Sequence, residues 1–303
     1  MRLYLLIVIC LILTSVRSAS AGADAVLVVF SADIAQYRQS FEGFRSAVLQ
    51  RNGALRTLEC YLDKEGADGV MQRITRERPR LVLAVGPEAA KLVRERVKGT
   101  PVVASMVLRP HLPAGPNLAW VLMEIPLRAK LERIRKGFPD FERIGIIYSP
   151  DTASLFREVA EACRALGLKA VGKEILSGKG LPEALNDIAP GIDVFLMVPD
   201  TKIYFPESVK YLLTEGLRRK LPIIGLSSSF TRGGALISFE ADYRELGRQA
   251  GETALQIIDG ARPGDMEPSR PRKIRASLNL AVAERLGIII NPRVVEDASD
   301  VFR

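Results

Sequence analysis

Short polar residues follow several apolar segments of this chain, and their side chains are of the types that bind small molecules through hydrogen bonds. They occur in the stretches 30–33, 86–88, 105–109, 149–154, 199–201 and 227–229. Hydroxyl, carboxylate and guanidinium groups can donate or accept such bonds without any covalent chemistry. The candidate binding residues in these stretches are Ser31, Gly86, Glu88, Arg109, Asp151, Ser154, Asp200 and Ser228.

The charged members of this set suggest which groups a ligand would carry. Asp200 would hold a cationic or hydroxyl group, and Arg109 would hold an anionic one. Helices are expected directly after most of the polar stretches, so free backbone amides would also favour an anion. Each Ser, Asp or Thr could instead simply cap its helix, so the hypothesis depends on the whole set.

The sequence gives no sign of a catalytic residue, a metal site or a cofactor. It contains neither a Gly-x-Ser-x-Gly elbow nor a phosphate-binding loop of the P-loop type. His111 is the only histidine, and one histidine without a cluster of cysteines or carboxylates does not favour a metal, so we assign it to a loop. We therefore expect a protein that is not an enzyme and that has no cofactor.

Two cysteines, Cys60 and Cys163, lie beyond the N-terminal apolar run. We expect them in different halves of the molecule, as buried free thiols and not as a disulfide. Two-lobed α/β racemases use one cysteine from each lobe, which keeps an enzyme as an alternative. Their cysteines lie on cleft loops, however, whereas Cys163 follows Val159 at helical spacing.

The elements that would position the polar stretches alternate regularly. The apolar residues Ile34, Tyr37, Phe41, Phe44 and Val48 are spaced as one face of a helix. Apolar strands without internal alternation, separated by amphipathic helices, are typical of a parallel sheet covered on both faces. The first half is expected to contain strands at 25–30, 55–61, 81–85 and 102–107, with helices at 34–48, 67–74 and 89–97.

The alternation restarts after a further strand at 117–123, which contains Trp120 as a core residue near the hinge. Strands are predicted at 144–148, 194–198 and 223–226, with helices opening at 126 and running over 155–166 and 209–217. The fold class is therefore α/β, with two doubly wound parallel-sheet lobes joined by three crossings near residues 123, 240 and 273. A single large sheet is the alternative. The expected lobes are 24–122 plus about 241–270, and 123–240 plus about 273–303.

This architecture indicates where a ligand would bind. In open parallel sheets, ligands bind beyond the carboxyl ends of the strands, which is where the polar stretches lie.

The N-terminus predicts export. Arg2 is followed by an apolar run over 3–13 and then by small residues with Ala-x-Ala spacing. This is the pattern of a secretory signal peptide, spanning 1–21, with cleavage after Ala21 or Ala23. A membrane anchor would need about 20 apolar residues. We expect a periplasmic protein.

The net charge of +8 is spread through the chain as a mixed-sign surface. A nucleic-acid groove would need clustered basic residues and stacking aromatics, so nucleic acid is not an expected partner.

The later part of the sequence resembles a family of ABC-transporter substrate-binding proteins with the type I periplasmic-binding fold, among them members that bind tryptophan or tyrosine. The resemblance rests on PLRAKLERIRKGFPDFERIGIIYSP (126–150), DVFLMVPD (193–200), GGALISFEADYRELGRQAGETALQIIDG (233–260) and LNLAVAERLGIII (278–290).

The resemblance implies a monomer whose two lobes close over a small polar ligand, such as an amino acid or a small carboxylate. It implies an inner-membrane ABC permease as partner. A sensory protein that presents the same fold to a membrane receptor or kinase is the alternative. Asp200 matches a family aspartate that meets the ligand's amino group, and Ser154 matches the serine of an Asn-Ser pair that holds the carboxylate.

The chain departs from the family pattern at three positions. Asp151-Thr152-Ala153 stands where the asparagine is expected, Gly86 replaces a threonine, and Arg109-Pro110 replaces Asp-Pro. The change from an acid to an arginine would suit a ligand that carries more negative charge.

Overall fold

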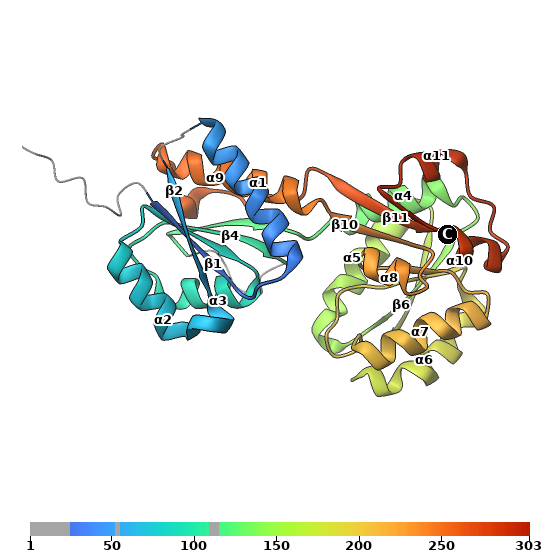
Figure 1. Cartoon of the computed structure of the whole chain (residues 1–303). Coiled ribbons are helices and arrows are strands. Elements are labelled where there is room, and N and C mark those ends of the chain that lie inside the picture. Colours follow the sequence, from blue (N-terminus) through green and yellow to red (C-terminus); the bar gives the residue numbers. More distant parts are fainter. Residues whose placement is uncertain (1–24, 52–54, 109–114) are drawn as a thin grey trace, which may run out of the picture.

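The computed structural model describes residues 25–51, 55–108 and 115–303 (Figure 1). The predicted signal peptide, Arg109 and His111 lie outside the described residues.

The first lobe is built on a five-stranded parallel sheet with the strand order β2-β1-β3-β4-β5. Every side chain of β1, β3, β4 and β5 is buried, because helices cover both faces. One face packs against α1 (Ala35–Arg51) and α9 (Tyr243–Ile258), and the other against α2 (Leu62–Glu77) and α3 (Pro87–Arg96). The strands are β1 (Ala25–Phe30), β2 (Arg56–Tyr61), β3 (Leu81–Val85), β4 (Val102–Val107) and β5 (Leu118–Leu122).

The second lobe contains a seven-stranded sheet with the order β12-β11-β10-β9-β8-β6-β7. Its pairs are parallel except β10 with β11, which are antiparallel. The strands are β6 (Arg143–Tyr148), β7 (Lys169–Glu174), β8 (Val194–Leu196), β9 (Ile223–Gly225), β10 (Ile237–Ala241), β11 (Ile274–Asn279) and β12 (Asp300–Phe302). The helices are α4 (Leu127–Gly137), α5 (Ala153–Ala165), α6 (Leu181–Ile188), α7 (Pro206–Arg218), α8 (Ser228–Arg232), α10 (Leu280–Leu286) and α11 (Pro292–Glu296).

The two-lobed α/β class predicted from the sequence is confirmed, and the single-sheet alternative is wrong. The strands and helices predicted in the first half are present within a few residues of their expected bounds. The sequence did not predict strand β7, helix α6 or the strands β11 and β12. The antiparallel pair also departs from the all-parallel expectation, because β11 returns directly from the first lobe without a crossover helix.

The chain passes between the lobes three times: between β5 and α4, between β10 and α9, and between residue 270 and β11. Figure 1 shows α9 over the first lobe beside α1, although it follows β10 of the second lobe. Glycines allow α1 and α9 to approach closely. A Cβ built on Gly247 would overlap the carbonyl oxygen of Ser40, and one on Gly43 would overlap that of Arg244.

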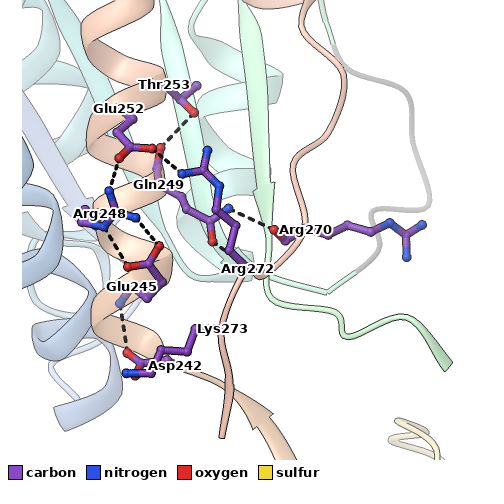
Figure 2. A network of polar contacts seen from close by, with 9 residues as sticks. All are labelled: Asp242, Glu245, Arg248, Gln249, Glu252, Thr253, Arg270, Arg272 and Lys273. Carbon is purple, nitrogen blue, oxygen red and sulfur yellow. Dashed lines mark hydrogen bonds and ion pairs between the residues drawn. The ribbon is translucent and has the colours of Figure 1, made fainter. Parts of the chain in front are cut away.

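The second and third crossings are bonded to each other and to α9 (Figure 2). Asp242 accepts a hydrogen bond from the backbone N–H of Glu245 and pairs with Lys273 Nζ at 2.9 Å. The Gln249 side chain donates to the Arg270 carbonyl at 2.9 Å and accepts from the Arg272 N–H at 3.1 Å. These contacts hold residues 270–273 along the helix, so the two crossings are expected to move as one unit with the first lobe.

Cys60 and Cys163 are both buried free thiols, as predicted, in different lobes. Burial raises the pKa of Cys60 to about 12 and that of Cys163 to about 11, which keeps both thiols protonated and unreactive. Trp120 is also a core residue, at 4% exposure.

Candidate ligand-binding site

Three cavities adjoin one another near the crossings between the lobes, and Tyr243 at the second crossing lines all of them. We call them the polar cavity (about 570 Å³), the side cavity (about 520 Å³) and the apolar cavity (about 600 Å³). Leu108 and Met123 line both the polar and the apolar cavity. Volumes of this size suit a small-molecule ligand.

The polar cavity lies at the carboxyl ends of strands β6, β8, β9 and β10 of the second lobe. Its polar and charged lining residues are Glu124, Lys130, Asp151, Thr152, Ser154, Asp200, Thr201, Lys202, Ser227, Glu240 and Tyr243. Of the eight residues predicted from the sequence, Asp151, Ser154 and Asp200 line this cavity.

Asp200 follows β8 and is 6% exposed. Its Oδ2 accepts hydrogen bonds from the Ser149 N–H at 2.9 Å and the Thr152 hydroxyl at 2.5 Å, and its Oδ1 accepts one from the Lys202 N–H at 3.0 Å. Burial alone would raise the pKa of Asp200, but these donors outweigh it and hold the pKa below its ordinary value. The carboxylate is therefore charged, and Oδ1 retains a lone pair for a further donor.

The neighbouring charges at the mouth of the polar cavity are paired or exposed. Asp151 forms an ion pair with Lys202 at 2.7 Å, and both side chains are more than half exposed. Ser154 is exposed at the start of α5.

The Tyr243 hydroxyl donates to Glu240 at 2.7 Å, and burial together with Glu240 raises the pKa of Tyr243. Tyr243 is therefore a neutral phenol.

Lys130 is a buried cation on the wall of the polar cavity, at 8% exposure. It lies in the first turn of α4, on the face that also carries the buried residues Leu127, Leu131 and Ile134. Burial lowers the pKa of Lys130 to about 8, and the charge of Glu124 acts in the opposite direction. At neutral pH the ammonium group is still mostly charged.

The apolar cavity belongs mainly to the first lobe. Its lining includes Ile34, Tyr37, Pro87, Met106, Val107, Leu108, Trp120 and Met123. Met106 adopts a left-handed backbone conformation (φ 60°) where the register between β4 and β5 shifts. Backbone strain of this kind in non-glycine residues clusters at functional sites, although Arg78 and Lys220 also have positive φ and line none of these cavities. The Trp120 Nε1 beside this cavity is buried, and among the described residues it has no hydrogen-bond partner.

The remaining predicted residues lie elsewhere. Ser31 accepts a hydrogen bond from the Ala89 N–H at 2.9 Å, which makes it a cap of α3. Gly86, with φ 96°, leaves the space that the Tyr37 hydroxyl occupies, and Glu88 is exposed nearby. Ser31 and Gly86 lie beside the Tyr37 hydroxyl, and none of the three residues lines the cavities. Ser228 lines the side cavity.

The sequence prediction missed Lys130, Tyr37 and Tyr243. Lys130 had a detectable signal, because a lysine interrupts the apolar spacing of Leu127, Leu131 and Ile134. Tyr37 and Tyr243 could not be separated from ordinary core aromatics by spacing alone.

Replacement of Asp200 by alanine is expected to weaken both the second lobe and ligand binding. Three donors lose their acceptor, so we expect roughly 3 kcal/mol less stability, from about 1–3 kcal/mol for each buried group left unsatisfied. Urea unfolding measures this loss. Asp187→Ala is the matched control, because within the described part of the chain its carboxylate contacts Lys173 alone, in an exposed ion pair. A loss below about 1 kcal/mol would show that the three bonds contribute little.

Two features bear on alternative roles. Within residues 25–51, 55–108 and 115–303, no group of three or more His, Cys, Asp or Glu residues could hold a metal ion. Over the same residues, no helix has the length and hydropathy needed to cross a bilayer.

Two α/β lobes, connected three times and with ligand-sized cavities beside the crossings, define the fold of the type I periplasmic-binding class. The chain belongs to the ABC transporter substrate binding protein family, whose model matches residues 59–302. This is the family that the sequence resembles.

A tyrosine-binding protein of Clostridioides difficile (strain R20291) is 22% identical over 216 residues, which are 67% of this chain and 62% of that protein. The match therefore spans less than two thirds of that relative's length.

Solved structures show the same fold. A substrate binding protein with adhesive properties from Clostridium difficile, in its ligand-free, open form, is 18% identical with a TM-score of 0.78, covering 92% of this chain and 99% of that one. The ABC domain from Streptococcus pneumonia in complex with L-Trp is 18% identical with a TM-score of 0.66, covering 92% and 100%.

Proposed function

We propose that this protein is the solute-capturing component of an ABC-type uptake system, and that it binds an amino acid or a small carboxylate between its lobes. The observation that carries the proposal is the pair of adjoining cavities that share Leu108, Met123 and Tyr243, one lined by charged as well as apolar side chains and the other lined mainly by apolar ones. Family membership and the amino-acid ligands named for two relatives support it.

The proposal includes the wider organisation expected from the sequence. The protein is exported to the periplasm, acts as a monomer, delivers its ligand to an inner-membrane permease and catalyses no reaction. The lobes are 24–122 plus about 241–270, and 123–240 plus about 273–303, hinged near residues 123, 240 and 273. Asp151, Ser154 and Asp200 contact the ligand from the second lobe, while Ser31 and Gly86 position Tyr37 on the first.

A thermal-shift screen against amino acids, small carboxylates, nucleosides and sugars tests this function. A ligand that binds only the folded protein stabilises it by about 2.7 kcal/mol at a hundredfold excess over Kd. We expect a rise in Tm with at least one amino acid or carboxylate. A rise with sugars or nucleosides alone would reject the ligand class, and no rise with any compound would reject solute capture.

A further inference from the structure

Lys130 is a cation that the fold buries without giving it a direct partner. Its side chain lies on the wall of the polar cavity at 8% exposure, and in the described part of the chain its ammonium group forms neither a hydrogen bond nor an ion pair. Glu124 acts on this charge through space. Removing an ammonium group from water costs several kcal/mol, roughly, unless a counter-charge replaces the lost hydration.

The other charged groups of the polar cavity already have partners. Lys202 is paired with Asp151, and Asp200 accepts three hydrogen bonds from residues 149–152 and 202. Glu240 accepts the Tyr243 hydroxyl. An incoming anion would therefore meet Lys130 as the cation whose hydrogen-bonding capacity is unused.

The start of α4 adds a second source of positive potential at the same place. The residue before the helix is Pro126, which offers no side-chain cap, so the first amides of this 11-residue helix have no cap bond. Glu124, Ile125 and Leu127 line the polar cavity beside Lys130. Free amides at the start of a helix favour an anion. The buried Lys130 ammonium group belongs to the first turn of the same helix.

The polar cavity continues into the apolar one past Leu108, Met123 and Tyr243. A molecule held by an anionic group at Lys130 would therefore place an apolar body against the first lobe, where Trp120 and Met106 lie. We propose that Lys130 and the amides at the start of α4 form the anion subsite of the cleft, and that it takes the carboxylate of a ligand with an apolar body. This inference rests on the proposed function, since it names the ligand group that the cleft selects.

Calorimetric titration with two matched series of probes tests the subsite. One series is L-tyrosine, 3-(4-hydroxyphenyl)propionate and tyramine, and the other is L-leucine, 4-methylpentanoate and isoamylamine. In each series the first two compounds carry a carboxylate and the third does not. We expect at least one carboxylate-bearing probe to bind, and the matching amine to bind at least about tenfold more weakly.

The same titrations with variants assign the effect to Lys130. Lys130→Met is expected to lower the affinity of the carboxylate probes at least about tenfold, and Lys130→Arg to retain more of it. Lys136→Met is the matched control, because Lys136 is exposed on the same helix. Unchanged carboxylate affinity in Lys130→Met, equal binding of the amine, or no binding in either series would overturn the inference. A ligand found by the broad thermal-shift screen in any of these cases would leave the proposed function standing.

Discussion

Gly247→Ala is expected to destabilise the protein strongly, because the added methyl group has less room than at any other described glycine. The new Cβ would overlap the carbonyl oxygen of Ser40 on α1, where α1 crosses α9. Because the obstacle is backbone, no rotamer change relieves it, and the two helices must separate. Overpacking costs about 1–3 kcal/mol and occasionally more, and we expect the upper end or beyond. Urea unfolding of the purified protein measures the loss.

Gly69→Ala on α2 is the matched control. Apart from the backbone of its own helix, the described heavy atom nearest to a Cβ there is the Glu65 Cβ at 3.3 Å, and Gly69 lies in the helical part of α2 that follows the non-helical Gly66. Alanine in a helix interior is favoured over glycine by up to about 1 kcal/mol, so this variant should be neutral or slightly more stable. If Gly247→Ala matched Gly69→Ala in stability, the close crossing of α1 and α9 would be refuted.

Lys130→Met is expected to make the unliganded protein more stable. Burial lowers the pKa of Lys130 from 10.5 to about 8, so below pH 8 the folded state carries a charge that it disfavours. At about 1.4 kcal/mol for each unit of pKa, methionine should gain up to about 3 kcal/mol at pH 7. Between pH 8 and 10.5 the unfolded chain keeps a proton that the folded protein has lost. The stability of the wild type should therefore rise with pH relative to the variant, until the two converge.

Urea unfolding of both proteins at several pH values measures this difference. Wild type and variant share the other titratable groups of the polar cavity, so the contributions of these groups to the pH dependence of the stability difference largely cancel. These groups are Glu124, Asp151, Asp200, Lys202, Glu240 and Tyr243. Lys136→Met should show no such convergence, since that lysine is exposed. A variant less stable than the wild type at pH 7 would mean that Lys130 is retained for the fold. Greater stability with weaker carboxylate binding would mean that it is retained for the ligand.

The sequence predicted the buried elements well, because continuous apolar runs and helical spacing reflect burial directly. It missed β7, which is an edge strand with no fully buried side chain. It also missed β11 and β12, at the other end of the sheet, where the strand returning from the first lobe pairs in the antiparallel direction. The edge strands β7 and β12 carry exposed or half-buried side chains, so their pattern resembles that of a loop. This reason does not apply to β11, an inner strand whose last four residues are buried.

The site was harder to predict than the fold. Short polar residues after strands of the second lobe indicated the sheet edge at which the polar cavity lies, and Asp151, Ser154 and Asp200 line that cavity. Spacing could not show that Ser31 is used as a helix cap, or that Tyr37 and Tyr243 reach the cleft from helices. These facts depend on contacts between elements far apart in the sequence, which no local pattern records.

The distance between the lobes, with and without ligand, tests the central claim most directly. Spin labels on Lys98→Cys and Lys179→Cys would report it, because both positions are exposed, lie on different lobes and line none of the three cavities, while Cys60 and Cys163 are buried. Pulsed electron–electron double resonance would be recorded before and after adding a mixture of the standard amino acids and short organic acids. Capture between the lobes predicts that the distance distribution shortens and narrows when the mixture is added. A distribution unchanged at saturating concentrations would contradict ligand capture by closure of the two lobes.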